Sequence, residues 1–393
     1  MTDIKDGQKV YIVTGATGFL ASYLIPRLLR DNCRLILLGR SNDKESLKDR
    51  VISSLTESVN LSRVDFIESD VQKDNLGLSD EMINDLKTKH ITSIWHLAAN
   101  LSFREKDAQD VLDVNINGTL KVIELATQLQ CKIYYVSTSY ISGRSSGVTY
   151  EKIYNHVNYN NTYERSKSVS EKNIIKWSKE KNLNYIIFRP SILIDRNKAV
   201  DSVFGYYSIL SSLYSLKKMI DASKARNSIL KIILSTNTDG ITNIRLPFLC
   251  SNDRYINLMP VDLASDWMAK VANDQSGINK IYHITNPNPL LLSDVWSRSL
   301  HSVGLVPIII KSPFRITNLY WSLLLTTLNS LSGLKRTGRI MRYYRWYMVN
   351  GAQYDMTNLS KIVGDSIMKY SKDELVPLDF IAKNHVAIIS EQK

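Results

Sequence analysis

The first half of the chain alternates short apolar runs with longer helical stretches. The apolar runs are near-continuous rather than strictly alternating with polar residues, which is typical of strands buried on both faces of a parallel sheet. They predict strands at residues 9–15, 34–40, 64–70, 93–98, 132–138 and 184–191. The stretches between them predict helices at residues 19–31, 43–57, 79–89, 107–129 and 163–182. Repeated β-α units favour an α/β fold, a Rossmann-type doubly wound parallel sheet with right-handed crossovers.

The second half of the chain has a different pattern. Strand-like pieces mix with helices as far as residues 280–286, which predict one more buried strand, and the last hundred residues are mostly helical in pattern. We therefore expect a Rossmann domain at residues 1–198, with strands returning around 253–286, and a smaller, mostly helical C-terminal lobe at 199–393. Because no internal repeat or low-complexity linker separates them, we expect the lobe to be partly interleaved with the sheet and packed on it.

The composition is that of an ordinary globular protein. The 393 residues are 44% hydrophobic and 22% charged, which suits one large domain or two coupled ones. The cysteines Cys33, Cys131 and Cys250 lie in apolar contexts and fit no metal-ligand spacing, so we expect buried, reduced thiols and no metal site. The polar N-terminus lacks the apolar core of a signal peptide, and no run reaches the length of a clear membrane span. These features predict a cytoplasmic chain.

The net charge of +12 favours acidic partners. Nucleotide phosphates, an acidic carrier protein, anionic lipid and nucleic acid all fit this description, and charge by itself does not choose among them. The choice depends on the motifs that accompany the charge.

A glycine-rich turn follows the first strand directly, in the sequence VTGATGFLASYLIPRLL. Gly15 permits the tight turn, Gly18 lets the backbone approach a pyrophosphate, and Ala21 is small enough for helix–sheet packing. The helix that follows presents free N–H groups and a partial positive charge to the phosphates. The sequence therefore predicts a dinucleotide site, whose cofactor-binding residues in this turn are Gly15, Thr17, Gly18, Phe19 and Leu20.

The end of the second strand bears on the choice of dinucleotide. NAD enzymes normally carry an acid there, which holds the ribose hydroxyls of the adenosine. This chain instead has Arg40, whose forked cation suits a 2′-phosphate, and Ser41, which adds a donor, while Asp43 lies a little further on. The pattern favours NADP(H) and so makes residues 1–198 an NADP-binding domain. Asp70 and Val71, which end the third strand, are placed to meet the adenine ring, although a plain strand-end turn explains them almost as well.

The sequence YERSK places Tyr163 and Lys167 about one helical turn apart, so that both side chains project from one face. Hydride transfer to a carbonyl builds negative charge on oxygen, and a proton donor must then lie beside that oxygen. A phenol with a pKa near 10 is a sluggish acid at neutral pH, but a neighbouring cation favours its anion and lowers that pKa. Taken alone, such a pair is more often a surface tyrosine and lysine, so its meaning depends on the surrounding motifs.

Six motifs occur in the order seen in the extended short-chain dehydrogenase/reductases: TGATGFLA, HLAA, NINGT, VSTSYISG, YERSK and RPS. Each is weak alone, and together they make residues 8 to about 290 resemble that family. The resemblance implies that Tyr163 is the proton donor and that Lys167 also holds the nicotinamide ribose. It implies a substrate-orienting hydroxyl at Thr138, with Ser139 as an adjacent candidate.

The resemblance also implies roles for residues in the other motifs. Asn115 matches the helix asparagine that supports a water relay to the lysine, and His96 is expected to be structural, beneath the cofactor. The further cofactor contacts that it implies are Ala98, Ala99, Arg189, Pro190 and Ser191, the last three at the carboxamide end of the nicotinamide.

Two later segments narrow the choice within that family. LPFLCSNDRYINLMPVDLASDWMAKVA, continued by YHITNPNPLLLSDVW, resembles the thioester-reductase pattern, and YDMTNLSKIVG resembles the C-terminal segment of fatty-acyl reductases. The resemblance implies NADPH-dependent reduction of an acyl thioester, on an acyl or peptidyl carrier protein or on CoA, to an aldehyde and in a second cycle to an alcohol. The C-terminal lobe would then bind this substrate.

Two alternatives stay open. The first is an NAD(P)-dependent reductase, dehydrogenase or epimerase of a free carbonyl or alcohol, with a sterol-, flavonol- or nucleotide-sugar-like substrate. The second is a cofactor-binding protein without turnover, against which the intact Tyr163 and Lys167 argue. The acyl chain and the oligomeric state are left open by the sequence.

A basic, aromatic segment at residues 332–351 has three interpretations. It docks a carrier or CoA phosphates, or it lies against an anionic membrane surface together with the leucine-rich stretch before it, so that residues 316–350 make a peripheral contact. The third interpretation is a solvated basic helix face. No nucleic-acid-binding module accompanies the charge, so nucleic acid is not expected as a partner.

Overall fold

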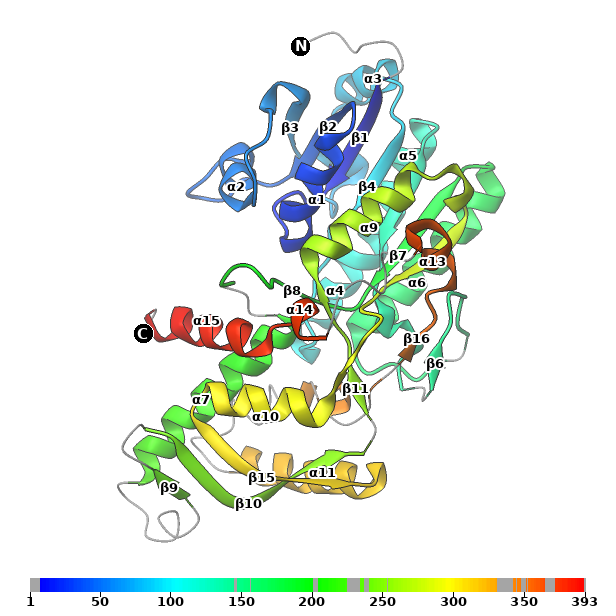
Figure 1. The fold of residues 1–393 in the computed structure, drawn as a ribbon. Helices are drawn as coiled ribbons and strands as arrows, with labels where there is room; N and C mark the ends of the chain where they lie inside the picture. The colour runs from blue at the N-terminus through cyan, green and yellow to red at the C-terminus, as the bar shows by residue number, and fades with distance from the viewer. Residues whose placement is uncertain are drawn as a thin grey trace.

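The computed structural model describes residues 8–144, 147–155, 157–200, 204–224, 234–236, 240–252, 254–330, 342–343, 345–347, 351, 353–364 and 372–391. Figure 1 shows an upper part built around one large sheet and a lower part built around a small sheet and long helices. The C-terminal helix α15 (Leu378–Glu391) packs against α7 (Gly205–Lys224) and α10 (Leu292–Ser302) of the lower part.

The large sheet has seven parallel strands in the order β13-β7-β5-β4-β1-β2-β3. Their bounds are Lys9–Thr14 (β1), Cys33–Gly39 (β2), Val64–Glu68 (β3), Ser93–His96 (β4), Lys132–Val136 (β5), Tyr185–Pro190 (β7) and Lys280–Ile284 (β13). The chain builds outward from β1 to β3 and then returns to the other side of β1, so the topological switch point lies between β1 and β4. The predicted doubly wound α/β fold is confirmed, and the late strand expected at 280–286 joins the sheet beside β7.

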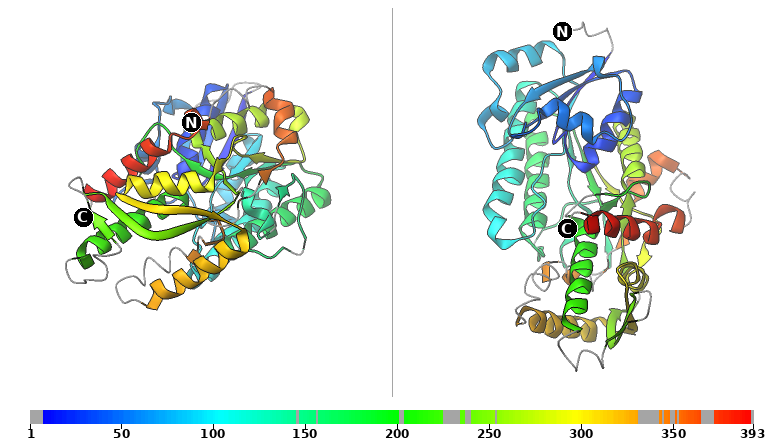
Figure 2. Two further views of the ribbon diagram at one scale, coloured as in Figure 1. Left: turned by 60° about the horizontal axis from the view of Figure 1, so that its bottom comes forward. Right: turned by 90° about the vertical axis from the view of Figure 1, so that its left-hand side faces the viewer.

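Helices cover both faces of this sheet, as Figure 2 shows. Successive residues of β1 point to opposite faces, so Val10 and Ile12 enter one hydrophobic core while Tyr11 and Val13 enter the other. The first core is closed by α3, α5 and α6, and the second by α1 and α9. The bounds are Phe19–Arg30 (α1), Leu47–Ser54 (α2), Asp80–Thr88 (α3), Ala108–Leu112 (α4), Gly118–Gln128 (α5), Thr162–Lys181 (α6) and Val261–Asn273 (α9).

The C-terminal lobe is mostly helical, as expected, and also contains a small sheet of order β15-β10-β9. In it, β10 (Thr242–Ser251) runs parallel to β15 (Leu305–Ser312) and antiparallel to β9 (Leu234–Thr236). Helix α11 (Phe314–Ser330) packs against β10. Two short strand pairs link the lobe to the large sheet: β8 (Ile192–Ile194) with β12 (Leu258–Pro260), and β11 (Tyr255–Ile256) with β14 (Leu290–Leu291).

A late segment of the chain returns to the Rossmann part, and we call residues 351–364 the C-terminal strap. Its strand β16 (Gln353–Tyr354) pairs in parallel with β6 (Val148–Thr149), and its helix α13 (Thr357–Val363) packs beside β13 and α9. Glu151 accepts hydrogen bonds from the backbone N–H of His283 (2.9 Å) and of Asn358 (2.7 Å), which ties the strap to the sheet. The strap is followed by the short helix α14 (Lys372–Leu375).

The three cysteines are buried and unbridged, as expected. In the part of the chain that the structure describes, no group of His, Cys, Asp and Glu is arranged to hold a metal ion. Within the same described residues, none of the helices combines the length and apolar character needed to span a membrane.

Candidate active site

The glycine-rich turn lies where β1 ends and α1 begins. Gly15 has φ +72°, and a Cβ atom placed on it would lie 2.6 Å from the backbone nitrogen of Ala98, so only glycine fits. The N–H of Gly18 donates to the Gly15 carbonyl (3.0 Å), and α1 starts at the next residue with no acidic side chain in its first turn. The turn is therefore a cradle that can take a pyrophosphate close to the helix N-terminus.

A cavity of about 480 Å³ runs from this turn along the carboxyl ends of the strands. Most of the predicted site residues line it: Gly15, Thr17, Gly18, Phe19, Leu20, Arg40, Asp70, Val71, Ala98, Ala99, Thr138, Tyr163, Lys167, Pro190 and Ser191. Three predicted residues do not, namely Ser41, Asn115 and Arg189. The cavity thus brings the glycine motif and the tyrosine motif to one site.

Two guanidinium groups mark the end of the cavity nearest β2. The Arg40 side chain is 67% exposed and lies 3.6 Å from an oxygen of Asp70. Arg50, which the sequence reasoning missed, reaches the same end from α2, where it donates to the Arg40 carbonyl. Ser41 turns away and bonds Glu68 through its backbone N–H and its hydroxyl, while Asp43 is exposed and outside the lining.

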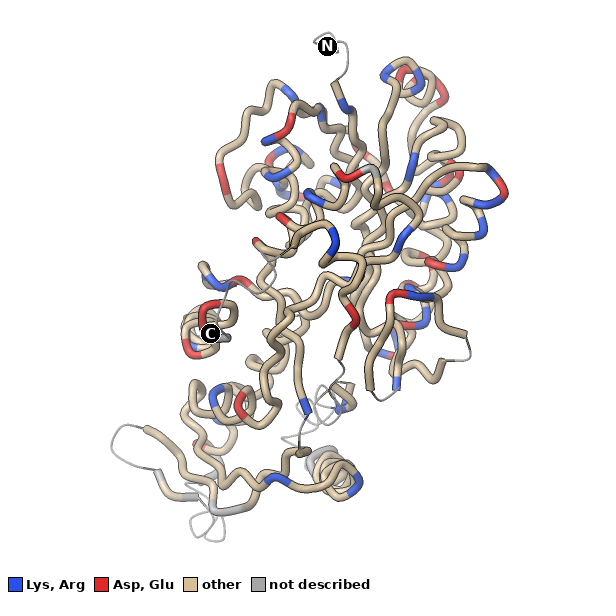
Figure 3. Tube along the Cα trace, turned by 45° about the vertical axis from the view of Figure 1, so that its right-hand side comes forward, with Lys and Arg blue, Asp and Glu red and all other residues tan. Residues whose placement is uncertain are grey.

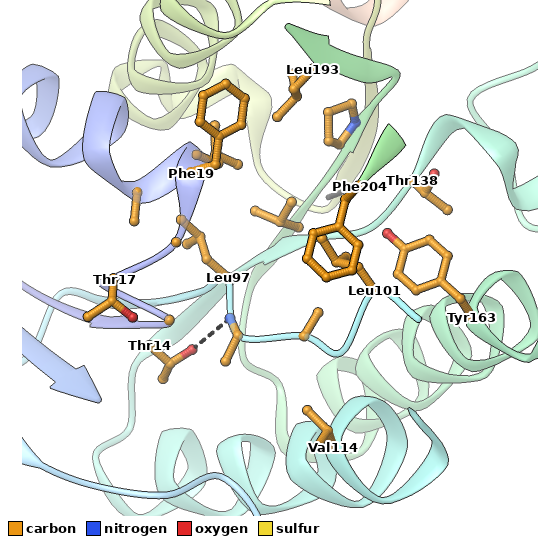
Figure 4. A pocket seen from close by; sticks show the side chains of 18 of the residues that line it. Thr14, Thr17, Phe19, Leu97, Leu101, Val114, Thr138, Tyr163, Leu193 and Phe204 are labelled. Carbon is orange, nitrogen blue, oxygen red and sulfur yellow. Dashed lines mark hydrogen bonds between the residues drawn. The ribbon is translucent and has the colours of Figure 1, made fainter. Parts of the chain in front are cut away.

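Helix α6 holds Tyr163 and Lys167 at the other end of the cavity. The Lys167 ammonium donates to the Val136 carbonyl (2.7 Å) and lies 4.7 Å from the centre of the Tyr135 ring. Thr138 follows β5, and its hydroxyl accepts from the N–H of Tyr140 (3.3 Å). Figure 4 shows the Tyr163 hydroxyl pointing into the cavity beside Phe204, with Thr138 nearby.

The lining separates the two candidate substrate-orienting hydroxyls. Thr138 lines the cavity, whereas Ser139 is fully buried outside the lining. Thr138 is therefore the hydroxyl that can meet a bound substrate beside Tyr163.

Burial dominates the titration of both motif residues. It raises the pKa of Tyr163, an effect to which the neighbouring Glu164 carboxylate adds and which the Thr138 hydroxyl opposes. Burial also lowers the pKa of Lys167 to about 7, although Glu171 acts in the opposite direction. The expected lowering of the Tyr163 pKa by Lys167 is therefore not found, and the pKa rises because burial is the largest effect on the phenol.

Asn115 lies behind the cavity, in a π-helical turn (Asp113–Asn117) between α4 and α5. Its side-chain oxygen accepts from the N–H of Asn100 (2.8 Å), and its Nδ2 donates to the Ser166 hydroxyl (2.9 Å). The Asn115 carbonyl accepts from the hydroxyl of Ser170 (2.7 Å) and of Thr119 (2.6 Å). The residue therefore fastens the loop after β4 to α6, and its role in a water relay stays a prediction.

Arg189 points away from the predicted nicotinamide site. Its side chain is fully buried and makes a two-pronged pair with Glu171, at 2.9 Å and 2.7 Å, and further bonds to the carbonyls of Tyr150 and Lys152. Side chains alternate along β7, so Pro190 reaches the cavity while Arg189 faces the other side. Its side chain is thus not placed to meet the carboxamide.

His96 is enclosed beneath the cavity. Its Nδ1 lies 2.8 Å from the Thr14 hydroxyl and its Nε2 lies 3.1 Å from the Thr119 hydroxyl. Burial lowers the pKa of His96 to about 3, which keeps the ring neutral at physiological pH. These contacts fit the expected structural role.

An aromatic group adjoins the Tyr163 ring through Phe103, and the sequence reasoning did not identify it. The Phe103 ring centre lies 5.7 Å from that of Tyr163 and 5.8 Å from that of Tyr347. Tyr140 meets Tyr347 edge-on at 4.8 Å. Tyr347 comes from the basic, aromatic segment at 332–351, whose richness in aromatic residues was the one available signal.

A Rossmann sheet of this topology, with Tyr163, Lys167 and Thr138 gathered at its switch-point crevice, defines the extended short-chain dehydrogenase/reductase fold. Within it, the chain belongs to the male sterility protein family, whose sequence profile matches residues 13–268. That span covers most of the large sheet and all six motifs from TGATGFLA to RPS.

Individual relatives agree with this assignment. The nonribosomal peptide synthetase asaC of Aspergillus flavus is 32% identical over 204 residues, which cover 47% of this chain and 20% of the relative. The putative fatty acyl-CoA reductase CG8306 of Drosophila melanogaster is 31% identical over 170 residues, covering 39% of this chain and 32% of the relative. The chain therefore spans less than two thirds of the length of these curated relatives.

Among solved structures, the terminal R domain of the myxalamid PKS-NRPS pathway has the same fold, with a TM-score of 0.71 and 20% identity over 99% of this chain and 92% of that one. The UDP-glucuronic acid 4-epimerase of Bacillus cereus, in complex with NAD, has a TM-score of 0.60 and 15% identity over 97% of this chain and 99% of that one. These likenesses extend to the C-terminal lobe.

Proposed function

We propose that the chain catalyses the NADPH-dependent reduction of an acyl thioester, carried on a phosphopantetheine arm or on CoA, to an aldehyde. The observation that carries this proposal is the gathering of Thr138, Tyr163 and Lys167 around the cavity that begins at the Gly15 turn. The choice of a thioester is supported by relatives whose names are fatty acyl-CoA reductase and nonribosomal peptide synthetase.

The residues of the cavity fit a dinucleotide with an additional phosphate. The Gly15 cradle and the N-terminus of α1 suit the pyrophosphate. Arg40 and Arg50 stand where an NAD enzyme would place a ribose-binding acid, and their cations suit a 2′-phosphate. NADP(H) is therefore the proposed cofactor.

When bound, NADPH supplies the hydride that forms the new C–H bond at the thioester carbonyl. Thr138 and Tyr163 hold the oxygen as it becomes negatively charged, and Tyr163 shares its proton with it. Lys167 lies one turn from Tyr163 and lines the same cavity, which supports the role of holding the nicotinamide ribose that the family resemblance implies. Collapse of the resulting hemithioacetal breaks the C–S bond and gives an aldehyde and a thiol, and a second hydride would give an alcohol.

The substrate would arrive, in the cytoplasm, on an acyl or peptidyl carrier protein or as a CoA thioester. The net charge of +12 favours either, because carrier proteins are typically acidic and CoA carries phosphates. Two interpretations of the basic segment, carrier docking and peripheral membrane contact, rest largely on residues 331–341, which lie outside the described part of the chain.

A substrate panel tests the proposal. NADPH consumption is followed with acyl-CoA and acyl-carrier thioesters and, in parallel, with free ketones. Alcohols are tested by the reduction of NADP+, and nucleotide sugars by analysis of the sugar product. The account predicts oxidation of NADPH with a thioester and a loss of about 10²- to 10⁴-fold in kcat for Tyr163→Phe. Turnover of free carbonyls or nucleotide sugars alone would favour the alternative activity, and unchanged NADPH binding without any turnover would favour a binding protein.

A further inference from the structure

The thioester reaction needs a proton at a place that Tyr163 does not serve. An acyl thioester, a hydride and a proton give an aldehyde and a thiol, so the consumed proton ends on sulfur and not on oxygen. A proton that Tyr163 lends to the carbonyl oxygen must return when the C=O bond of the aldehyde forms. A second donor near the departing sulfur therefore makes the step easier, since an alkyl thiol with a pKa near 8.5 leaves poorly as an anion.

We propose that Tyr347 is this second donor and that Glu164 supplies it with a proton, which rests on the thioester reductase function proposed above. In the step, the C–S bond breaks and its electron pair goes to sulfur, which takes the phenolic proton of Tyr347. The Tyr347 oxygen in turn takes the carboxylic proton of Glu164. The remaining carboxylate recovers a proton through Tyr347, from water in the cavity, between turnovers.

Tyr347 is placed for this role by its position beside Tyr163. It lines the same cavity and is 6% exposed. Its ring packs against Phe103, which also packs against Tyr163, so the two tyrosines flank one aromatic side chain. Its hydroxyl accepts from the Nδ2 of Asn161 (2.9 Å), which orients it.

Glu164 is an unusual carboxylate for the first turn of a helix. A glutamate at this position commonly caps the helix from the surface, and Glu164 does accept from the N–H of Asn160 (2.8 Å). Its side chain, however, is fully buried, and one of its oxygens accepts a hydrogen bond from the Tyr347 hydroxyl. The charge of Arg144 favours the ionised form of Glu164, but it is the smallest of the effects on its pKa.

The surroundings favour the protonated carboxyl. Burial raises the pKa of Glu164, against the hydrogen bonds from Asn160 and Tyr347. Burial and the adjacent Glu164 also raise the pKa of Tyr347, so its phenol stays protonated until a base such as a departing thiolate draws on it. When Glu164 is ionised, the Tyr347 hydroxyl donates to it. When Glu164 carries a proton, this bond reverses, so that the carboxyl donates to the Tyr347 oxygen and the phenolic hydrogen can turn toward the cavity.

A change of leaving group tests the proposal. Wild type, Tyr347→Phe and Glu164→Gln are compared on two thioesters of the same acyl chain, one of an alkyl thiol and one of an aryl thiol, which departs readily as an anion. We expect both variants to lose about 10²-fold in kcat on the alkyl thioester and less than about threefold on the aryl thioester. Equal losses on both substrates would assign the pair a structural role and overturn the proposal.

Tyr354→Phe is the matched control. It removes a phenolic hydroxyl from the C-terminal strap, and its ring belongs to the same aromatic group through Tyr140, but it does not line the cavity. We expect it to behave alike on both thioesters, and a leaving-group effect as large as that of Tyr347→Phe would contradict the assignment. If wild type reduces neither thioester, the proposed function itself is wrong. That outcome is distinct from a result that rejects only the role of Tyr347 and Glu164.

Discussion

The burial of Lys167 affects both the proposed chemistry and the stability of the protein. This residue is 2% exposed, and its ammonium donates to the Val136 carbonyl. An ammonium in such a place is costly, so its pKa falls from 10.5 to about 7. Under the proposed function, a lysine with a pKa near neutrality suits the support of proton transfer at Tyr163.

This shift has a consequence for stability. Between about pH 7 and about pH 10, the unfolded chain keeps the Lys167 proton while the folded chain releases it, so the free energy of unfolding contributed by this residue rises with pH. Relative to Lys167→Met, the wild type should gain at most about 1.4 kcal/mol per pH unit in this range. Urea unfolding at several pH values measures the difference, and parallel curves for the two proteins would contradict the shift.

At the scale of single elements, helix α2 brings Arg50, which belongs to no sequence motif, into the lining of the cavity. Arg50 is seven residues beyond Asp43 in the sequence, yet the fold of α2 against β3 brings it to the cavity beside Arg40. The sequence predicted the first arginine, because the strand end is a known position of the motif. It did not predict the second, because the direction of a helix after a loop depends on packing.

Arg40→Ala and Arg50→Ala should each raise KM for NADPH about 10- to 100-fold and change KM for NADH little, because each removes a charged contact to the 2′-phosphate. Steady-state kinetics with both cofactors gives the ratio. Lys48→Ala, which removes an exposed cation of α2 outside the cavity, is the control and should leave the ratio unchanged. An equal loss with both cofactors would speak against 2′-phosphate recognition.

The residues of the RPS motif, at the end of strand β7, do not all face the cavity. The carboxyl end of this strand delivers Pro190 and the following Ser191 to the cavity, but alternation turns Arg189 to the opposite face, where Glu171 meets it. The motif resemblance treated the three as one contact. Arg189 instead pairs with Glu171 of α6, because side chains alternate along the strand and α6 lies on the side that Arg189 faces.

Arg189→Met therefore tests stability rather than cofactor binding. It leaves the Glu171 carboxylate buried without its partner, which should lower the free energy of unfolding by about 3–5 kcal/mol. Chemical denaturation measures this loss, and the double variant Arg189→Met/Glu171→Leu should recover part of it. If NADPH affinity fell while stability held, Arg189 would contact the cofactor after all.

At the scale of the whole molecule, charge and apolar surface are unevenly distributed. Figure 3 shows charged positions throughout the Rossmann part and long uncharged stretches in the lower lobe. Helix α11 carries one charged residue, Arg315, and exposes Ile316, Leu319 and Leu323. The net charge of +12 acts over the molecule as a whole and favours the approach of an anionic substrate carrier.

Salt should therefore discriminate between forms of the substrate. Raising the salt from about 50 mM to about 300 mM shortens the screening length, so KM for an acyl-carrier protein should rise severalfold. KM for the uncharged acyl-pantetheine should change little, which makes it the control. Equal responses of the two substrates would exclude long-range attraction of the carrier.

The sequence predicted the sheet, the glycine turn and the tyrosine motif because each depends on contacts that are local or repeated along the chain. It could not predict that Tyr347 lies beside Tyr163. The two tyrosines are far apart in the sequence and meet the same ring, Phe103. Later in the chain, the strap also returns to the Rossmann part, where β16 pairs with β6 and Asn358 bonds Glu151. Long-range pairing of this kind leaves no periodic signal in the residues that make it.

Isotope transfer tests the central claim most directly. NADPH deuterated at the transferring position is incubated with an acyl thioester, and the products are analysed by mass spectrometry. The account predicts one deuterium on the former carbonyl carbon of the aldehyde, one free thiol for each NADPH consumed in forming it, and neither with Tyr163→Phe. Release of the thiol without deuterium in the product, or consumption of NADPH without loss of the thioester, would contradict it.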